Sequence, residues 1–104
     1  MPATEPTVAA TILAQLGGSR FVLMTGAKNL LDGGNHLTFR LPGNGFAKNG
    51  INCVRVTLNG TDTYTMEFLK VRGMKVTTVE TVSDVYDEAL RRVFTRVTGL
   101  DTHL

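Results

Sequence analysis

The alternation of apolar and polar residues between positions 51 and 72 is the feature that most constrains the fold of this chain. A period of two places one set of side chains on a buried face of a β-strand and the other set on the opposite face. The segment Asn59-Gly60-Thr61-Asp62 separates two such runs, and these residue types tolerate the positive φ of a tight turn. The sequence therefore predicts a β-hairpin folded about Thr61. In that register the opposing pairs are Leu58 with Tyr64, Val56 with Met66, Val54 with Phe68, Thr57 with Thr65, and Arg55 with Glu67.

A helix is expected before the strands. Thr4 is a suitable N-cap, and Gly17 and Gly18 end the apolar stripe that follows it. The stripe has helical spacing and consists of Val8, Ile12, Leu13 and Leu16.

A second helix is expected near the C-terminus. Ser83 is its predicted N-cap, Asp84 places negative charge at the positive end of the helix dipole, and Gly99 follows its last turn. Acid-first pairs at i, i+4 are expected between Asp87 and Arg91 and between Glu88 and Arg92. The predicted buried stripe consists of Tyr86, Leu90, Val93, Phe94 and Val97.

Three further strands complete the expected fold. They are predicted over residues 20–25, 36–41 and 74–79, and the segment TGAKNLLDGGN connects the first two. The 104 residues are expected to form a single domain, 1–104. The predicted fold class is α+β, an antiparallel meander sheet of four or five strands flanked by an N-terminal and a C-terminal helix, in the order α-β-β-β-β-β-α.

Composition excludes several classes of protein. With 42% hydrophobic and 19% charged residues, the chain is typical of a globular protein rather than a disordered one. It holds no apolar run of the ~20 residues that a membrane-spanning helix needs, and its N-terminus does not match a signal peptide. One cysteine, Cys53, allows no intrachain disulfide. We therefore expect a cytoplasmic protein with no membrane partner.

The sequence contains no recognisable catalytic set. Two histidines and one cysteine cannot build a metal site of usual spacing, and Cys53 with His36 lacks an orienting third group. The segment Gly26-Ala27-Lys28 lacks the glycine spacing and the Ser/Thr of a phosphate-binding loop. The prediction is a protein that is not an enzyme and uses no cofactor or metal.

The distribution of charge along the chain favours nucleic acid as a partner. Residues 18–75 hold eight basic residues against three acids, and guanidiniums and hydroxyls on a sheet can contact phosphate oxygens. The alternative is an ordinary solvated face, because Glu67 can neutralise Arg55 and the strand aromatics share the inward phase. The candidate nucleic-acid-binding residues are Arg40, Arg55, Thr38, Thr57, Lys48 and Lys28.

The segment Phe68-Leu69-Lys70-Val71 has apolar residues in both phases, so we expect both sides of that strand end to be covered. A helix or loop of the same chain is one candidate cover. The other is a second subunit, in a homodimer that would contact through Leu69 and Val71.

Several phrases, LGGSRFVLMTGAKN, LTFRLP, TYTMEFL and TGLDTHL, occur together along nearly the whole chain. In combination they resemble a group of small uncharacterised proteins of bacteriophages, prophages and plasmids, with the pattern LGGxxFxxMTGAKN … TGLxTxL. The resemblance implies a mobile-element origin and a small accessory role, and no reaction. Packing explains Met24-Thr25-Gly26-Ala27-Lys28-Asn29 least: it is either a polar cluster at a sheet edge or a bulge and turn.

Two functions are consistent with these features. The first is a non-catalytic accessory protein that binds single- or double-stranded nucleic acid through a basic sheet face. The second is a protein-interaction module, an inhibitor or adaptor of a host protein, with a surface made of the 68–71 segment and the acidic C-terminal helix.

Overall fold

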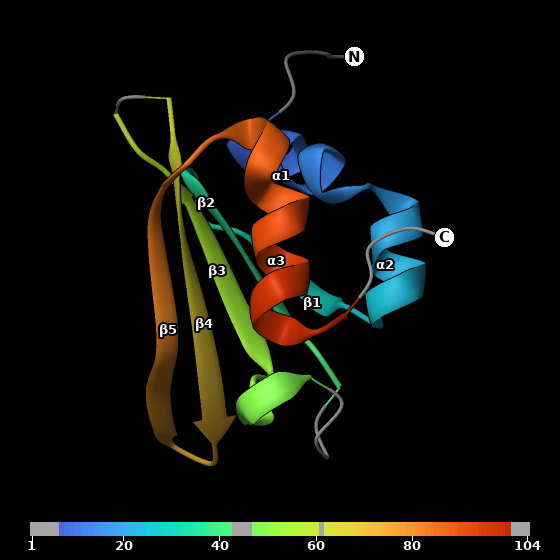
Figure 1. The fold of residues 1–104 in the computed structure, drawn as a ribbon, viewed down its shortest axis with the longest axis vertical. Helices are drawn as coiled ribbons and strands as arrows, with labels where there is room; N and C mark the ends of the chain where they lie inside the picture. The colour runs from blue at the N-terminus through green and yellow to red at the C-terminus, as the bar shows by residue number, and fades with distance from the viewer. Residues whose placement is uncertain (1–6, 43–46, 61, 101–104) are drawn as a thin grey trace.

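The computed structural model describes residues 7–42, 47–60 and 62–100 of the chain. Figure 1 shows the order of helices and strands along these residues. In sequence they are α1 (Val8–Leu16), α2 (Ser19–Thr25), β1 (Lys28–Asp32), β2 (His36–Arg40), the 3₁₀ turn η1 (Lys48–Gly50), β3 (Cys53–Leu58), β4 (Tyr64–Arg72), β5 (Lys75–Val85), the 3₁₀ turn η2 (Asp87–Ala89) and α3 (Leu90–Thr98).

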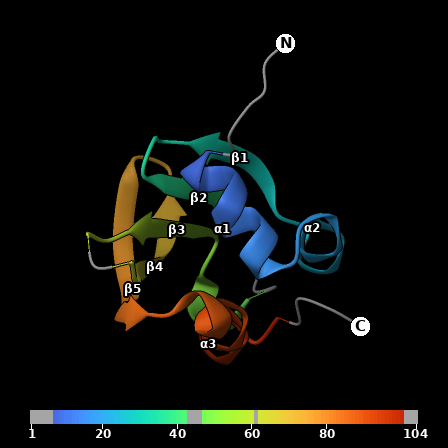
Figure 2. The ribbon, with the colours of Figure 1, turned by 90° about the horizontal axis from the view of Figure 1, so that it is seen from above.

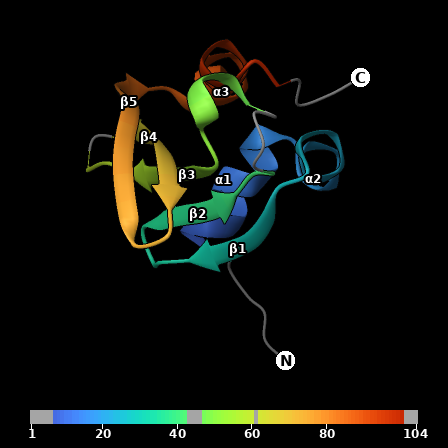
Figure 3. The ribbon, with the colours of Figure 1, turned by 90° about the horizontal axis from the view of Figure 1, so that it is seen from below.

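The five strands form one antiparallel meander in the order β1-β2-β3-β4-β5. Seen from above and from below, the sheet curves so that α1 and α3 lie on the same side of it (Figure 2, Figure 3). Helices therefore cover one face of the sheet and leave the other face open. The predicted α+β class, with a meander sheet and helices at both ends, is confirmed.

The central hairpin has the predicted register. Strands β3 and β4 pair all five predicted couples, from Leu58 with Tyr64 to Val54 with Phe68. The apolar members of these pairs lie in the core on the helix-covered face, and Arg55, Thr57, Thr65 and Glu67 lie on the other face. Alternation and turn chemistry thus agree on one register.

Three phenylalanines from distant parts of the chain meet at the centre of the core. Phe21, Phe39 and Phe94 are each 0% exposed. The ring centroid of Phe21 lies 5.3 Å from that of Phe39 and 5.1 Å from that of Phe94, and both pairs have edge-to-face geometry. This cluster joins α2, β2 and α3 and fixes the helices against the sheet.

The prediction of a strand over residues 20–25 is wrong. Residues Ser19–Thr25 form the helix α2, with Phe21 and Thr25 buried one turn apart and Leu23 exposed. Gly18 and Gly26, both with positive φ, bound it. The first strand lies later, at Lys28–Asp32, inside the segment expected to be a connection.

The C-terminal helix begins later than predicted. Ser83 and Asp84 lie on β5, which pairs with β4 as far as Val85 opposite Tyr64. Tyr86 is 64% exposed and is not part of the buried stripe, whereas Leu90, Phe94 and Val97 are buried as expected. The strand continues past Val79 because β4 provides a hydrogen-bonding partner along this length.

The acids Asp87 and Glu88 lie in η2, before the regular helix, whereas α3 itself carries Arg91, Arg92 and Arg96 and no acid. The description of this helix as acidic is therefore wrong. Its arginine Arg96 pairs with Glu80 on β5, at 3.4 Å.

Two helices end in the same way. The hydroxyl of Thr25 donates to the carbonyl of Phe21 and accepts from the amide of Ala27, and Gly26 follows in the left-handed conformation. Thr98 makes the equivalent bonds beside Gly99. Both threonines are buried, so Thr25 is a helix-terminating residue and not part of an exposed polar cluster. At the N-terminal end of α1, Thr7 is the N-cap, and the predicted cap Thr4 lies outside the described residues.

Candidate nucleic-acid interface

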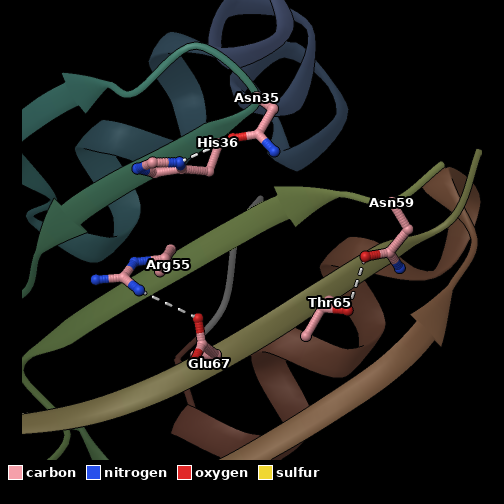
Figure 4. A network of polar contacts seen from close by, with 6 residues as sticks. All are labelled: Asn35, His36, Arg55, Asn59, Thr65 and Glu67. Carbon is pink, nitrogen blue, oxygen red and sulfur yellow. Dashed lines mark hydrogen bonds and ion pairs between the residues drawn. The ribbon is translucent and has the colours of Figure 1, made fainter.

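The sheet face opposite the helices, here called the open face, carries most of the predicted site residues. Figure 4 shows His36, Arg55, Thr65 and Glu67 in front of the sheet, with helices behind it. Cross-strand pairing sets Thr38 beside Arg55 and His36 beside Thr57 in rows across β2 and β3. The open face is therefore polar through its centre.

Three cations from three adjacent strands gather at one end of this face. Lys28 on β1 is directly opposite Arg40 on β2, and Arg40 is diagonal to Arg55 on β3. Directly opposed and diagonal side chains on a sheet lie about 5 Å and about 7–8 Å apart at their Cβ atoms. We call Lys28, Arg40 and Arg55 the basic cluster.

Arg40 occupies the middle of the basic cluster. Its Nε donates to the carbonyl oxygen of Asn52 at 3.4 Å, a contact that orients the planar guanidinium. Among the described residues, no carboxylate lies within the 4.0 Å of an ion pair to Arg40 or to Lys28. The terminal guanidinium nitrogens of Arg40 are thus available for an external anion, which Arg binds through two parallel hydrogen bonds.

Arg55 has a competing partner. Its Nη1 lies 3.5 Å from Oε1 of Glu67, and the two side chains are 46% and 32% exposed. An exposed pair of this kind contributes only about 0.2–1 kcal/mol. A phosphate can therefore displace Glu67 at small cost, although Glu67 lowers the positive potential of the face.

The threonine hydroxyls of this face differ in availability. The Oγ1 of Thr65 donates to Asn59 at 3.1 Å, within the polar contacts of the β3–β4 turn (Figure 4). The half-buried hydroxyls of Thr38 and Thr57 have no side-chain hydrogen bond to the residues described. Thr38 and Thr57 are therefore the hydroxyls that can donate to a ligand on this face.

Lys48 lies away from the other predicted site residues. It belongs to η1, and a Cβ built on Gly99 would lie 3.0 Å from Cε of Lys48, so its methylene chain passes over the C-terminal end of α3. A cation there is favoured by the exposed carbonyls and the helix dipole. The structure thus brings Lys28, Thr38, Arg40, Arg55 and Thr57 together on the open face and separates Lys48 from them.

The cysteine is enclosed beside the basic cluster. Cys53 is 6% exposed, opposite Arg40 on one side and Leu69 on the other. Burial raises the pKa of its thiol, more than the neighbouring Arg40 and Arg55 lower it. Cys53 is thus a weak nucleophile. His36 lies four residues along β2 from the partner of Cys53, about 13 Å away, so the two do not form a pair.

Leu69 is also buried, at 7% exposure, within the single chain. At Phe68 and Leu69 both sides of the strand are therefore buried. Val71, two residues on, is half-buried. Leu69 alone presents little surface to a second subunit.

A second cluster of basic residues was not predicted from the sequence. Lys70, Arg72 and Lys75 come together at the end of the β4–β5 hairpin, on the face opposite the basic cluster. Their signal in the sequence is the alternation of Lys70 and Arg72 before the Gly73 turn, with Lys75 directly after it.

Over residues 7–42, 47–60 and 62–100, no group of three His, Cys, Asp or Glu side chains is arranged to hold a metal ion. In the same residues no individual helix has the length and apolar character to cross a bilayer, and the pair α1 and α2 meets that test only jointly, across a 63° bend. No protein-family model, no curated protein and no solved structure matches this chain.

Proposed function

We propose that this protein is a small non-catalytic accessory protein of the phage type that binds nucleic acid through the open face. The observation that supports this most is the meeting of Lys28, Arg40 and Arg55 on three adjacent strands. Like charges placed directly opposite on a sheet, such as Lys28 and Arg40, lower stability. A polyanion relieves that repulsion by placing negative charge beside the cations. Each phosphate that is neutralised also releases condensed counterions, which favours binding.

The expected mode of binding is contact with the phosphate backbone. Guanidiniums, an ammonium and the hydroxyls of Thr38 and Thr57 are groups that bind phosphate oxygens. The aromatic side chains of the strands, Phe39, Tyr64 and Phe68, are buried in the core and cannot stack on bases. We therefore expect little sequence preference. The unpaired Cys53 is compatible with a reducing cytoplasm as the place of action.

Fluorescence anisotropy of labelled single- and double-stranded DNA tests the proposal. At about 20 mM salt we expect micromolar binding that weakens steeply toward about 150 mM, since phosphate contacts dominate. Arg40→Ala is expected to weaken binding by about 1–2 kcal/mol, roughly five- to thirty-fold, without unfolding the protein. The matched control is Arg91→Ala, which removes the same charge from the exposed face of α3. Equal binding by the two variants, or none at low salt, would reject the proposal.

A second candidate function is binding of a protein partner, including a second copy of the chain. It is favoured by the end of the β4–β5 hairpin, where Val76 is 58% exposed opposite Val71 and Met74 at the turn is fully exposed. Large apolar side chains that share an exposed surface often mark an interaction site. Sedimentation of the native protein and of Val76→Lys separates the cases: self-association through this surface would be lost in the variant.

A further inference from the structure

The strands β4 and β5 continue beyond the end of β3. Strand β3 begins at Cys53 opposite Leu69, whereas the ladder between β4 and β5 extends through Lys70 with Thr77 to Arg72 with Lys75. Residues 70–77 thus form a two-stranded extension, which we call the arm; it lies at the lower end of the sheet in Figure 1. Asn52 joins the base of the arm to the sheet. The side chain of Asn52 accepts a hydrogen bond from the amide of Val71 at 2.8 Å and donates one to the carbonyl oxygen of Val71 at 2.9 Å.

The two faces of the arm differ in character. Val71 and Val76 face each other on the continuation of the open face. Lys70, Arg72, Lys75 and Thr77 lie on the continuation of the helix-covered face and together line a hollow of about 180 Å³. That volume is well above the roughly 10–15 Å³ that one water needs on the same measure, so the hollow has room for a phosphate group.

Within the part of the chain that the structure describes, the cations of this hollow have no acidic partner. The described residues form two ion pairs, Arg55 with Glu67 and Arg96 with Glu80, and in them no carboxylate lies within 4.0 Å of the arm cations. Arg72 and Lys75 are direct cross-strand neighbours, an arrangement of like charges that lowers stability. An anion in the hollow removes this repulsion.

The side chain of one of the cations, Lys70, lies against a neighbouring turn of the chain. A Cβ built on Gly50 would lie 3.3 Å from Cε and 3.4 Å from Cδ of Lys70, so this side chain extends over η1. Lys70 is half-buried, whereas Arg72 and Lys75 are exposed. A positioned cation loses less conformational entropy on binding than a free one.

We propose that the arm is a phosphate-binding site formed by Lys70, Arg72, Lys75 and Thr77. Arg72 provides planar, two-pronged donation, the two lysines provide point charges, and the hydroxyl of Thr77 provides a further donor. The ligand class is a phosphate monoester or inorganic phosphate, whether free or at the end of a nucleic acid. The site lies on the opposite side of the sheet from the basic cluster, so it does not depend on the proposed function.

Titration of the ¹⁵N-labelled full chain with sodium phosphate, at ionic strength held constant with chloride, tests the site. We expect saturable shifts of the amides of residues 70–77. The double variant Arg72→Gln/Lys75→Gln should weaken the apparent affinity at least about ten-fold, and Lys75→Gln alone at least about three-fold. The charge-matched control Arg91→Gln/Arg92→Gln should change it less than about two-fold, because those arginines lie on α3. Absence of saturable shifts, or equal losses in variant and control, overturns the proposal.

Oligonucleotides with a 5′-phosphate and with a 5′-hydroxyl distinguish the sources of phosphate. Arm shifts with the phosphorylated strand alone indicate a nucleic acid end, and shifts with inorganic phosphate but neither strand indicate a small phosphorylated compound. DNA binding on the open face with no phosphate-induced shifts at the arm overturns this site and leaves the proposed function standing. Phosphate binding at the arm without DNA binding on the open face overturns the proposed function and leaves this site standing.

Discussion

Replacing Glu67 with Gln is expected to tighten nucleic-acid binding. Glu67 is the carboxylate that pairs with the basic cluster on the open face, at 3.5 Å from Arg55. The substitution keeps the shape of the side chain, removes one negative charge and frees the guanidinium. A gain of affinity is a sharper test of the open face than a loss, because partial unfolding of a variant can weaken DNA binding but cannot tighten it.

The size of the effect follows from the geometry. An exposed ion pair of this kind contributes about 0.2–1 kcal/mol. In Glu67→Gln this pair is absent, so DNA binding does not have to break it. A carboxylate about 6 Å from a bound phosphate adds about 0.7 kcal/mol of repulsion in water. Together these predict a gain of about 1–1.5 kcal/mol, roughly five- to twelve-fold in Kd. One additional phosphate contact also steepens the slope of log K against log salt by about 0.7 for single strands.

The assay is anisotropy of a labelled single strand at several salt concentrations, with Glu80→Gln as the control. Glu80 pairs with Arg96 at 3.4 Å, so its replacement makes the same charge change and breaks the same kind of ion pair away from the open face. Equal gains in both variants would show that net charge alone matters. Unchanged or weaker binding by Glu67→Gln would refute the assignment of this face.

Three further predictions concern stability. Phe94→Ala removes a ring from the fully buried aromatic cluster and is expected to cost about 3–5 kcal/mol, seen as a lower urea midpoint with an unchanged m-value. Thr25→Val is expected to cost about 1–3 kcal/mol in the same assay, because the buried amide of Ala27 loses its acceptor; a cost near zero would contradict the capping role. The folded pKa of Cys53 is raised above 9.0, so the unfolded chain loses the thiol proton first and stability falls as pH rises from about 9 through the folded pKa. The urea midpoint of the native chain should therefore fall more between pH 8 and about 10.5 than that of Cys53→Ala, and equal falls would contradict the burial argument.

The sequence was sufficient to predict the sheet around the central hairpin. Alternation, the Asn59–Asp62 turn and the cross-strand pairs all favoured one register, and such agreement leaves little room for a slip. The same reasoning placed Arg55 opposite Glu67 correctly. It also placed Thr38, Arg40 and Thr57 on one face, because β2 has the same clear alternation.

Short apolar segments were predicted less well. Residues 20–25 are rich in strand-forming types, and a run of six cannot be distinguished from a helix by periodicity. The helix forms because Phe21 contacts Phe39 and Phe94, which are distant in sequence. The pair Thr25-Gly26 was a usable signal for a helix end, since Thr98-Gly99 repeats it at the end of α3.

The basic surfaces depend on register that only the folded chain provides. Lys28 faces Arg40 because β1 begins after a two-residue connection from α2, and sequence reasoning had assigned α2 to a strand. Likewise Arg72 faces Lys75 because the hairpin turns at Gly73, with φ of 59°. Lys48 was assigned to the nucleic-acid surface from its place in a loop, but its side chain lies over the end of α3.

The most direct test of the nucleic-acid proposal is to map a short single-stranded DNA onto the ¹⁵N-labelled protein by amide chemical shifts at low salt. We expect the largest shifts in β2 and β3, around Thr38, Arg40 and Arg55, and no change on the exposed side of α3 near Arg91. Shifts confined to α3, or none at all, would contradict the assignment of the open face as the binding surface.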